Sequence, residues 1–309
     1  GGKAFYMPFL CLGVRAVNRD LKHYRRINWK NESKLLPGYL LMVLWLMFTV
    51  VLIGWIFAAS FSTTKEIFKG QALQFPTGLH FENYEKAWTS QNVSTFFFNS
   101  LFYASVSSVI LILVAAPAAY AISRFKFFLN RPLQSSFVAA MGVPVTMIIL
   151  PLFGIVSDLQ LLKQDVTIRL LLIFLYVGIN VPYATIFLLT FFTNLSRSYE
   201  EAAAIDGCPP VRTFWQVMLP LAQPGVVTVS IFNFINVWNE YFISLIFASG
   251  DKTRPVAVGL YSMINSMRYT GDWAGMFAAV IIVFLPTFLM YIFLSEKIIA
   301  GVTGGGVKG

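Results

Sequence analysis

The most unusual polar side chains of this 309-residue chain lie inside an apolar stretch near residues 221–248. Asn233, Asn236 and Glu240 are three and four residues apart, so a helix would place them on one face. An acidic group within a membrane costs about 2.5 kcal/mol or more and is expected to face a cavity or a partner. The stripe predicts either the lining of a polar path or hydrogen bonds between helices, and the sequence leaves both open.

Aromatic and amide side chains accompany this stripe. Trp238, Asn239 and Tyr241 surround Glu240, and an earlier apolar stretch contains Asn180 and Tyr183. Amide and carboxylate groups together with aromatic faces suit a ligand rich in hydroxyl groups. The full set of candidate path residues is Asn180, Tyr183, Asn233, Asn236, Trp238, Asn239, Glu240 and Tyr241.

A second group lies in the polar loop 196–220, which predicts a short helix with both ends marked. Ser198 followed by Glu201 fits a capping box, and the acidic pair Glu200 and Glu201 suits the positive helix end. Gly207 fits the C-terminal cap, and two prolines after it prevent the helix from continuing. The alanines 202–204 add a surface with little bulk, suited to a cleft in another protein.

The composition indicates what must position these groups. Of all residues 57% are hydrophobic and 12% are charged, whereas soluble domains have about 45–50% apolar and about 25% charged residues. This contrast excludes a soluble globular enzyme, a disordered chain and a disulfide-rich secreted module. It predicts an all-α polytopic membrane protein, since lipid offers no partner for open backbone groups.

Six apolar runs are long enough to cross a bilayer as helices. They cover Pro37–Phe61, Thr95–Ser123, Leu133–Val156, Ile168–Thr193, Leu221–Ala248 and Trp273–Leu294. Between the first two, Phe81, Tyr84 and Trp88 fall on one face of a surface helix. With the amino terminus inside, 15 of the 23 lysines and arginines lie on that side, so both termini are expected in the cytoplasm.

Three regions follow from this pattern. Residues 1–36 form a basic cytoplasmic or interfacial segment, residues 37–300 the membrane domain, and residues 301–309 a glycine-rich cytoplasmic tail. The net charge of +9 is explained by topology rather than by nucleic-acid binding.

Motifs for catalysis and metal binding are absent from the sequence. It has no phosphate-binding GxxxxGK[ST] loop, no GxSxG elbow and no HExxH helix. Its two cysteines and two histidines are dispersed, so neither a disulfide framework nor a zinc site is predicted. We expect no catalytic residue, no metal site and no enzymatic activity in this chain.

The 196–220 loop resembles the cytoplasmic hallmark of the permease subunits of ABC importers. That motif maps onto Glu201-Ala202-Ala203, Gly207, Val217, Leu219 and Pro220 with every spacing intact, and only Val217 replaces the usual isoleucine. The tail Gly301–Gly309, the stretch Trp238–Tyr241, and Asp251-Lys252 followed by Pro255-Val256 are similar to the maltose-type carbohydrate importers. The resemblance covers residues 37–309 and points to the six-span partner of the permease pair.

The resemblance implies a type I ABC importer permease fold in a bacterial inner membrane and a coupling helix that docks on an ATP-hydrolysing subunit. Its residues would be Tyr199, Glu200, Glu201, Ala202, Ala203, Ala204, Asp206 and Gly207, with Val217, Leu219 and Pro220 as loop framework. Gly304, Gly305, Gly306 and Lys308 would reach between the ATPase subunits.

The implied partners are a homologous second permease, two ATP-binding subunits that hold ATP and Mg, an extracytoplasmic solute-binding protein, a carbohydrate substrate and membrane lipid. No cofactor and no nucleic acid would bind this chain.

Three alternatives stay open. An ABC permease for a non-sugar solute would share the loop. An ion-coupled secondary transporter predicts inverted repeats and intramembrane charge pairs, and an ion channel predicts a filter or charged rings.

Overall fold

The computed structural model describes residues 29–69 and 76–304, with side chains described for residues 34–69, 76–266 and 271–296. Within the described residues the elements are helices and none is a strand, which confirms the all-α prediction. Most of the basic segment 1–36 and the tail residues Gly305, Gly306 and Lys308 lie outside the described part.

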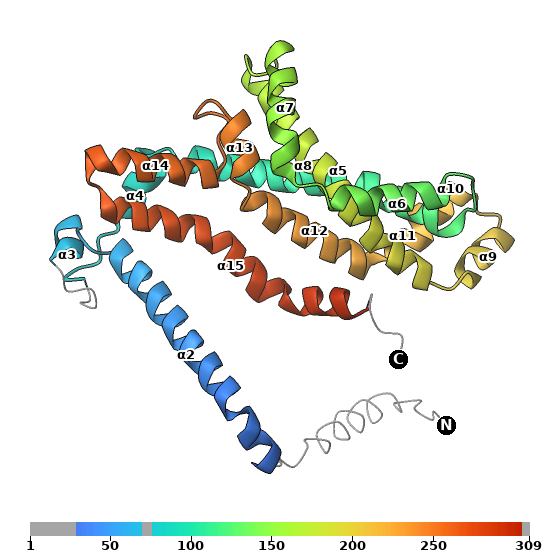
Figure 1. Ribbon diagram of the computed structural model, residues 1–309, viewed down its shortest axis with the longest axis horizontal. Helices are drawn as coiled ribbons and strands as arrows, with labels where there is room; N and C mark the ends of the chain where they lie inside the picture. Colours follow the sequence, from blue (N-terminus) through green and yellow to red (C-terminus); the bar gives the residue numbers. More distant parts are fainter. Residues whose placement is uncertain (1–28, 70–75, 305–309) are drawn as a thin grey trace, which may run out of the picture. The chain divides into compact units, whose positions relative to one another are not determined.

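The helices appear in Figure 1 under the labels used below. In chain order they are α2 (Trp29–Ser60), α3 (Thr64–Phe68), α4 (Glu82–Thr89), α5 (Val93–Arg124), α6 (Asn130–Met141), α7 (Val145–Asp158), α8 (Asp165–Asn194), α9 (Ser198–Ile205), α10 (Pro210–Thr213), the π-helix η1 (Phe214–Met218), α11 (Leu219–Leu221), α12 (Gln223–Trp238), α13 (Phe242–Phe247), α14 (Val256–Thr270) and α15 (Trp273–Gly304).

Four of the described helices contain segments long and apolar enough to cross a membrane: Lys34–Ser60, Val93–Arg124, Asp165–Asn194 and Trp273–Glu296. Two further helix pairs pass the same criterion but are sharply bent. The chain is therefore a multi-pass membrane protein, and a count of six is reached only if each bent pair crosses as one span.

The predicted third span, Leu133–Val156, is wrong as a single helix. α6 and α7 meet at 94°, and Pro144 takes an extended conformation with ψ 127° just before α7. Proline has no amide hydrogen and disfavours helical geometry in the residue before it, so the helix ends there.

The predicted fifth span, Leu221–Ala248, is also interrupted. α12 ends at Trp238, and a separate helix, α13, begins at Phe242. At its other end, α12 is bent by 75° against the helical segment Pro210–Leu221. The sixth helix, α15, instead runs past the expected end at Leu294 to Gly304.

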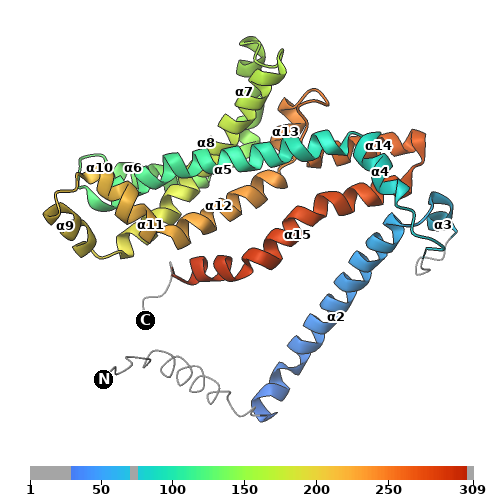
Figure 2. The same ribbon diagram turned by 180° about the vertical axis from the view of Figure 1, so that it is seen from behind.

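The chain divides into two compact units, residues 1–55 and 56–309. The first contains most of α2. In the second, α5, α8 and α12 pack side by side, as both views show (Figures 1 and 2). α9 and α10 lie at one end of α5, whereas α4 and α14 lie at its other end.

Two clusters of buried side chains hold these helices together. One surrounds Tyr103, Tyr176 and Phe247, and the other surrounds Phe192 and Phe214 nearer α9. The clusters join the helices that contain the polar stripe to the helices that support the 196–220 loop.

The predicted surface helix is α4, which packs on α15. Tyr84 and Trp88 face a buried cluster with Ala87 at its centre. Phe81 precedes the helix and is 63% exposed, although its ring lies 5.3 Å from that of Phe61. The one-face prediction therefore holds for Tyr84 and Trp88, while Phe81 marks the helix start.

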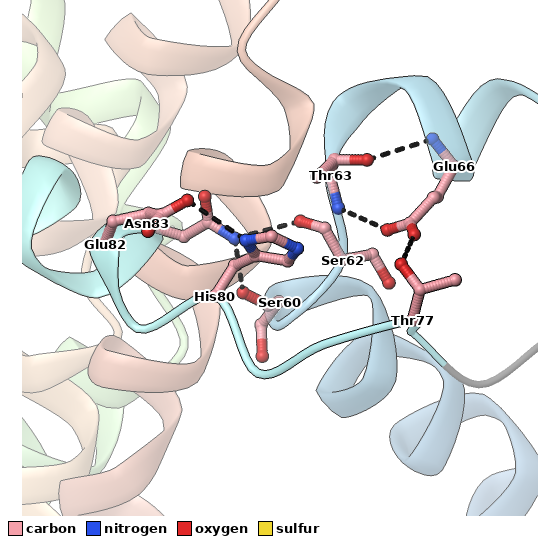
Figure 3. Close-up of polar contacts among 8 residues, drawn as sticks. All are labelled: Ser60, Ser62, Thr63, Glu66, Thr77, His80, Glu82 and Asn83. Atoms are coloured by element: carbon pink, nitrogen blue, oxygen red, sulfur yellow. Dashed lines mark hydrogen bonds and ion pairs between the residues drawn. The ribbon is translucent and has the colours of Figure 1, made fainter.

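Polar contacts tie the connection between α2 and α4 (Figure 3). Thr63 and Glu66 form a capping box at α3, and the hydroxyl of Thr77 donates to Glu66. Hydrogen bonds from the Thr63 backbone and the Thr77 side chain lower the pKa of Glu66 to about 2. Asn83 donates to the carbonyls of Ser60 and Ser62 at 3.0 and 2.9 Å.

Candidate functional site

The start of α9 differs from the sequence prediction. Arg197 already has helical dihedrals, and its carbonyl accepts the amides of Glu200 and Glu201 at 3.0 and 3.1 Å. Ser198 is thus the first helical residue, and its amide donates to Ser196 Oγ at 3.3 Å. The predicted capping box between Ser198 and Glu201 is wrong, because the cap position lies one residue earlier.

The predicted end of α9 is confirmed. Gly207 has a φ of +74°, a conformation that glycine adopts without steric cost. The amide of Gly207 donates to the Ala204 carbonyl at 3.0 Å, and the amide of Cys208 donates to the Ala203 carbonyl at 2.9 Å. These two bonds form a Schellman motif, which closes the helix and turns the chain sharply.

The two adjacent acidic residues of α9, Glu200 and Glu201, have different surroundings. Arg124, at the end of α5, donates through Nε to Glu200 at 3.0 Å and through Nη2 to the Leu195 carbonyl at 2.8 Å. The two side chains are only 7% and 20% exposed. Glu200 is therefore engaged within the chain and fixes α9 to α5, whereas Glu201 is exposed.

The outward face of α9 carries the small and acidic residues of the sequence motif. Ala203 is buried, whereas Ala202, Ala204 and Asp206 are exposed. Tyr199 is 46% exposed. The sequence analysis missed Ile205, which is 86% exposed, and Val211, which is 72% exposed. Their position in and just after the last turn of the predicted helix was the available signal, since large apolar side chains exposed together mark contact surfaces.

The rest of the loop is anchored in the core. Phe214 lies 5.0 Å from Tyr120 and 6.1 Å from Phe192 between ring centroids. Val217 and Leu219 pack against the same cluster. Pro220 lies in the short helix α11, and α12 begins three residues later. These contacts connect α9 rigidly to α5, α8 and α12.

Glu240 lies at the break between α12 and α13. Its Oε1 accepts the Ile243 amide at 2.6 Å, and its Oε2 accepts the Ser244 amide at 3.1 Å and the Ser244 hydroxyl at 2.8 Å. Tyr176 donates to Oε2 at 3.3 Å. The carboxylate therefore serves the first-turn amides of α13, which have no helical partner of their own.

Two cavities lie along α12 and share Asn180 and Asn236. The first, about 250 Å³, is also lined by Tyr183 and Asn233. The second, about 260 Å³, is also lined by Glu240. The Asn236 amide donates to Asn180 Oδ1 at 3.0 Å between them. The stripe thus supplies both cavity lining and interhelical hydrogen bonds.

Asn233 combines both roles. Its amide donates to Ser108 Oγ at 2.9 Å, which links α12 to α5. Its Oδ1 is buried without a hydrogen-bond partner in the described structure. An unpaired buried acceptor is costly, so this oxygen is suited to a donor that enters the cavity.

Three of the predicted path residues line neither cavity. Trp238 is 1% exposed, stacks on Phe234, and donates to the Val283 carbonyl of α15 at 3.2 Å. Asn239 is exposed but donates back to Ile235 at 2.8 Å, and Tyr241 packs on Tyr261. Trp238 is a core residue in this structure.

A polar clamp on the loop before α14 was not identified from the sequence. Asn99 donates to the carbonyls of Lys252 and Arg254, both at 2.9 Å. Tyr103 donates to the Thr253 carbonyl at 2.8 Å, and Arg169 to the Lys252 carbonyl at 2.7 Å. These side chains come from α5 and α8, so only the tertiary structure brings them to the loop.

Among the side chains that the structure describes, no group of three or more His, Cys, Asp or Glu residues is arranged to hold a metal ion. The arrangement instead provides a fixed, outward-facing helix at one end and polar cavities among broken helices.

Comparison with known proteins agrees with this arrangement. The family model described as "Binding-protein-dependent transport system inner membrane component" matches residues 108–295. A solved structure, described as a bacterial ABC transporter involved in the import of the acidic polysaccharide alginate, has a chain with a TM-score of 0.76 at 22% identity. The alignment covers 88% of this chain and 98% of that chain, and it shows a shared fold.

Three curated relatives are similar over most of their length. A diacetylchitobiose uptake system permease protein of Streptomyces coelicolor is 32% identical, over 87% of both chains. A sulfoquinovosyl glycerol transport system permease protein of Agrobacterium fabrum is 31% identical, over 82% of this chain and 87% of the relative. A trehalose transport system permease protein of Mycobacterium tuberculosis is 28% identical, over 92% and 98%.

Replacing Arg124 with Gln should destabilise the protein by about 2 kcal/mol, because Glu200 keeps its partly buried charge without a cationic partner. Thermal unfolding in detergent measures this loss. The charge-reversed double variant, Arg124→Glu with Glu200→Arg, should recover at least half of it. Lys86→Gln, an exposed change at the other end of the bundle, is the control, and equal melting of Arg124→Gln and the control would contradict the assignment.

Replacing Glu240 with Ala should cost about 1–3 kcal/mol, because the amides of Ile243 and Ser244 lose their acceptor. Glu240→Gln keeps one acceptor oxygen and should lose less. Ser244→Ala is the matched control, since it removes one hydroxyl and leaves the carboxylate in place. Denaturant unfolding of the three variants ranks their free energies of unfolding. A Glu240→Ala protein as stable as wild type would refute the capping role.

Proposed function

Because the chain belongs to the family of binding-protein-dependent transport system inner membrane components, we propose that it is the membrane-spanning permease subunit of an ATP-driven carbohydrate importer. One observation carries the mechanism. α9 presents Glu201 and two alanines outward while Glu200 fixes the same helix to α5. A helix that is both exposed and rigidly attached can transmit the motion of a partner into the membrane.

The partner at α9 is an ATP-binding subunit. Glu201 pairs with a basic side chain there, and Ile205 and Val211 add apolar contact. Two such subunits hold ATP and Mg, and this chain binds no cofactor itself. We expect the tail residues Gly304, Gly305, Gly306 and Lys308 to contact the two subunits, since a segment poor in side chains fits a narrow gap.

A homologous permease and an extracytoplasmic solute-binding protein complete the importer. Large apolar side chains of α7, including Met147 and Leu150, are 71% and 70% exposed, which supports burial against lipid or a second membrane subunit. Both termini lie in the cytoplasm of a bacterium, in agreement with the basic residues on that side.

The substrate is a carbohydrate or a related polyol or glycoside. The cavities combine the amides of Asn180, Asn233 and Asn236 with the ring of Tyr183, and Asn233 Oδ1 lacks a partner. Hydroxyl groups of a sugar can donate to such oxygens. The three relatives described above are named for sugars or sugar derivatives, so a non-sugar solute and an ion-coupled mechanism are not favoured.

Transport follows from the connections of α9. Closure of the ATP-binding subunits moves α9, and the Glu200–Arg124 ion pair passes this motion to α5. The breaks at Pro144 and Glu240 let helical segments on either side of the cavities move as separate bodies. The path then alternates between outward and inward access by rigid-body motion.

Replacing Glu201 with Lys should lower sugar uptake at least tenfold, because a repulsive charge would face the basic side chain of the ATP-binding subunit. The amount of chain in the membrane and its thermal stability should not change, since Glu201 is exposed. Uptake of labelled trehalose and diacetylchitobiose is measured in proteoliposomes, together with ATP hydrolysis. Glu85→Lys, the same change at an exposed position of α4, is the control, and wild-type uptake by Glu201→Lys would overturn the coupling role.

Replacing Asn236 with Leu should reduce uptake about tenfold, because it removes a hydrogen-bonding group from both cavities and fills part of them. Asn239→Leu is the matched comparison, since this exposed amide lies three residues away and lines neither cavity. We expect it to have the smaller effect. Equal uptake by the two variants would refute the assignment of the path.

A further inference from the structure

A basic cavity of about 560 Å³ lies where α5 ends and α6 begins. Arg124, Lys126, Arg131 and Arg197 line it, and its lining contains no acidic residue. Arg124 is neutralised by Glu200. In the described part of the chain the other three cations form no ion pair, so three uncompensated positive charges surround one cavity.

The backbone that forms this cavity is held in place by hydrogen bonds. The side-chain amide of Asn130 donates through Nδ2 to the backbone carbonyls of Ile122 and Phe125, both at 2.8 Å. Gln134 donates in turn to Asn130 Oδ1 at 2.6 Å. Asn130 therefore satisfies carbonyls at the end of α5 and fixes the turn that carries Lys126.

Large apolar side chains line the cavity together with its basic residues. Phe128 is 94% exposed and Phe127 is 42% exposed, and both line the same cavity. α6, which follows directly, has no buried residue. This combination of uncompensated charge and exposed aromatic side chains is amphiphilic, as at surfaces that lie in the headgroup region.

The length of α5 supports a position at headgroup depth. Its 32 residues extend about 48 Å at 1.5 Å per residue, whereas the hydrocarbon core is about 30 Å thick. The last residues of α5 and the turn after it therefore reach the polar layer of the bilayer. Basic pockets at this depth are suited to lipid phosphates.

We propose that this cavity binds the headgroup of an anionic phospholipid, with the phosphate held by Lys126, Arg131 and Arg197. Phe127 and Phe128 enter the acyl layer beside it. The site is separate from the cavities near Glu240 and does not depend on the identity of the transported solute. Because Arg197 directly precedes α9, the bound lipid lies next to the base of that helix.

Native mass spectrometry of the complete complex in detergent tests the proposal, with phosphatidylglycerol and phosphatidylcholine added in equal amounts. Wild type should retain phosphatidylglycerol preferentially, and the triple variant Lys126→Gln, Arg131→Gln, Arg197→Gln should lose that preference by about fivefold for each cation removed. The control is Lys65→Gln, Lys69→Gln, Lys86→Gln, which removes three exposed cations at the other end of the bundle.

The single variant Arg131→Gln keeps the test valid if the triple variant does not fold, and it should weaken the preference about fivefold. Unchanged preference in the folded triple variant would overturn the proposal. If millimolar glycerol phosphate displaced bound phosphatidylglycerol as effectively as added phosphatidylglycerol does, the cavity would be assigned to a free phosphate instead. If the triple variant lost the ATP-binding subunits but kept its lipid preference, the cavity would be assigned to a protein contact, which would equally refute the lipid site.

Discussion

The backbone amides in the first turn of a helix have no acceptor within the helix, so each helix that begins in the protein interior needs one from elsewhere. Glu240 supplies that acceptor at the break between α12 and α13, where it receives the amides of Ile243 and Ser244. Tyr176 and Ser244 complete its hydrogen bonding. One carboxylate thus permits the interruption between the two helices. The cavity lined by Glu240 lies at this interruption, and it shares Asn180 and Asn236 with the second cavity along α12.

Neighbouring acidic side chains also have separate roles in the loop that faces the proposed ATP-binding subunits. Two adjacent acidic residues serve different partners, since Glu200 binds Arg124 inside the chain and Glu201 remains exposed. The inner contact makes the outer one mechanically useful, because a force on a loosely held helix would not reach α5. The Schellman motif at Gly207 and the Phe214 contacts with Tyr120 and Phe192 add to that rigidity.

Much of the fold was predictable from the sequence, and the errors have specific physical causes. The apolar runs gave the long helices α2, α5, α8 and α15 to within a few residues at most ends. They did not reveal the break in the fifth span, since composition alone does not distinguish a continuous helix from two helices whose exposed amides have a side-chain acceptor. The break in the third span did have a signal in the sequence, because Pro144 lies at it. The capping-box pattern was assigned to Ser198 and Glu201, but the structure forms it at Thr63 and Glu66. Helical dihedrals at Arg197 leave Ser198 inside the helix.

The sequence by itself determined that the chain is helical and embedded in a membrane, because hydrophobicity and charge act locally through the solvent. It also determined the 196–220 motif, because Gly207 and the flanking prolines act on the adjacent backbone. Only the tertiary structure decided that Trp238 packs in the core while Asn236 lines both cavities, that Glu200 meets Arg124, and that Asn99 and Tyr103 hold the loop before α14. Those outcomes depend on which helices pack together, and contacts between residues 45 or more positions apart leave no mark on local spacing.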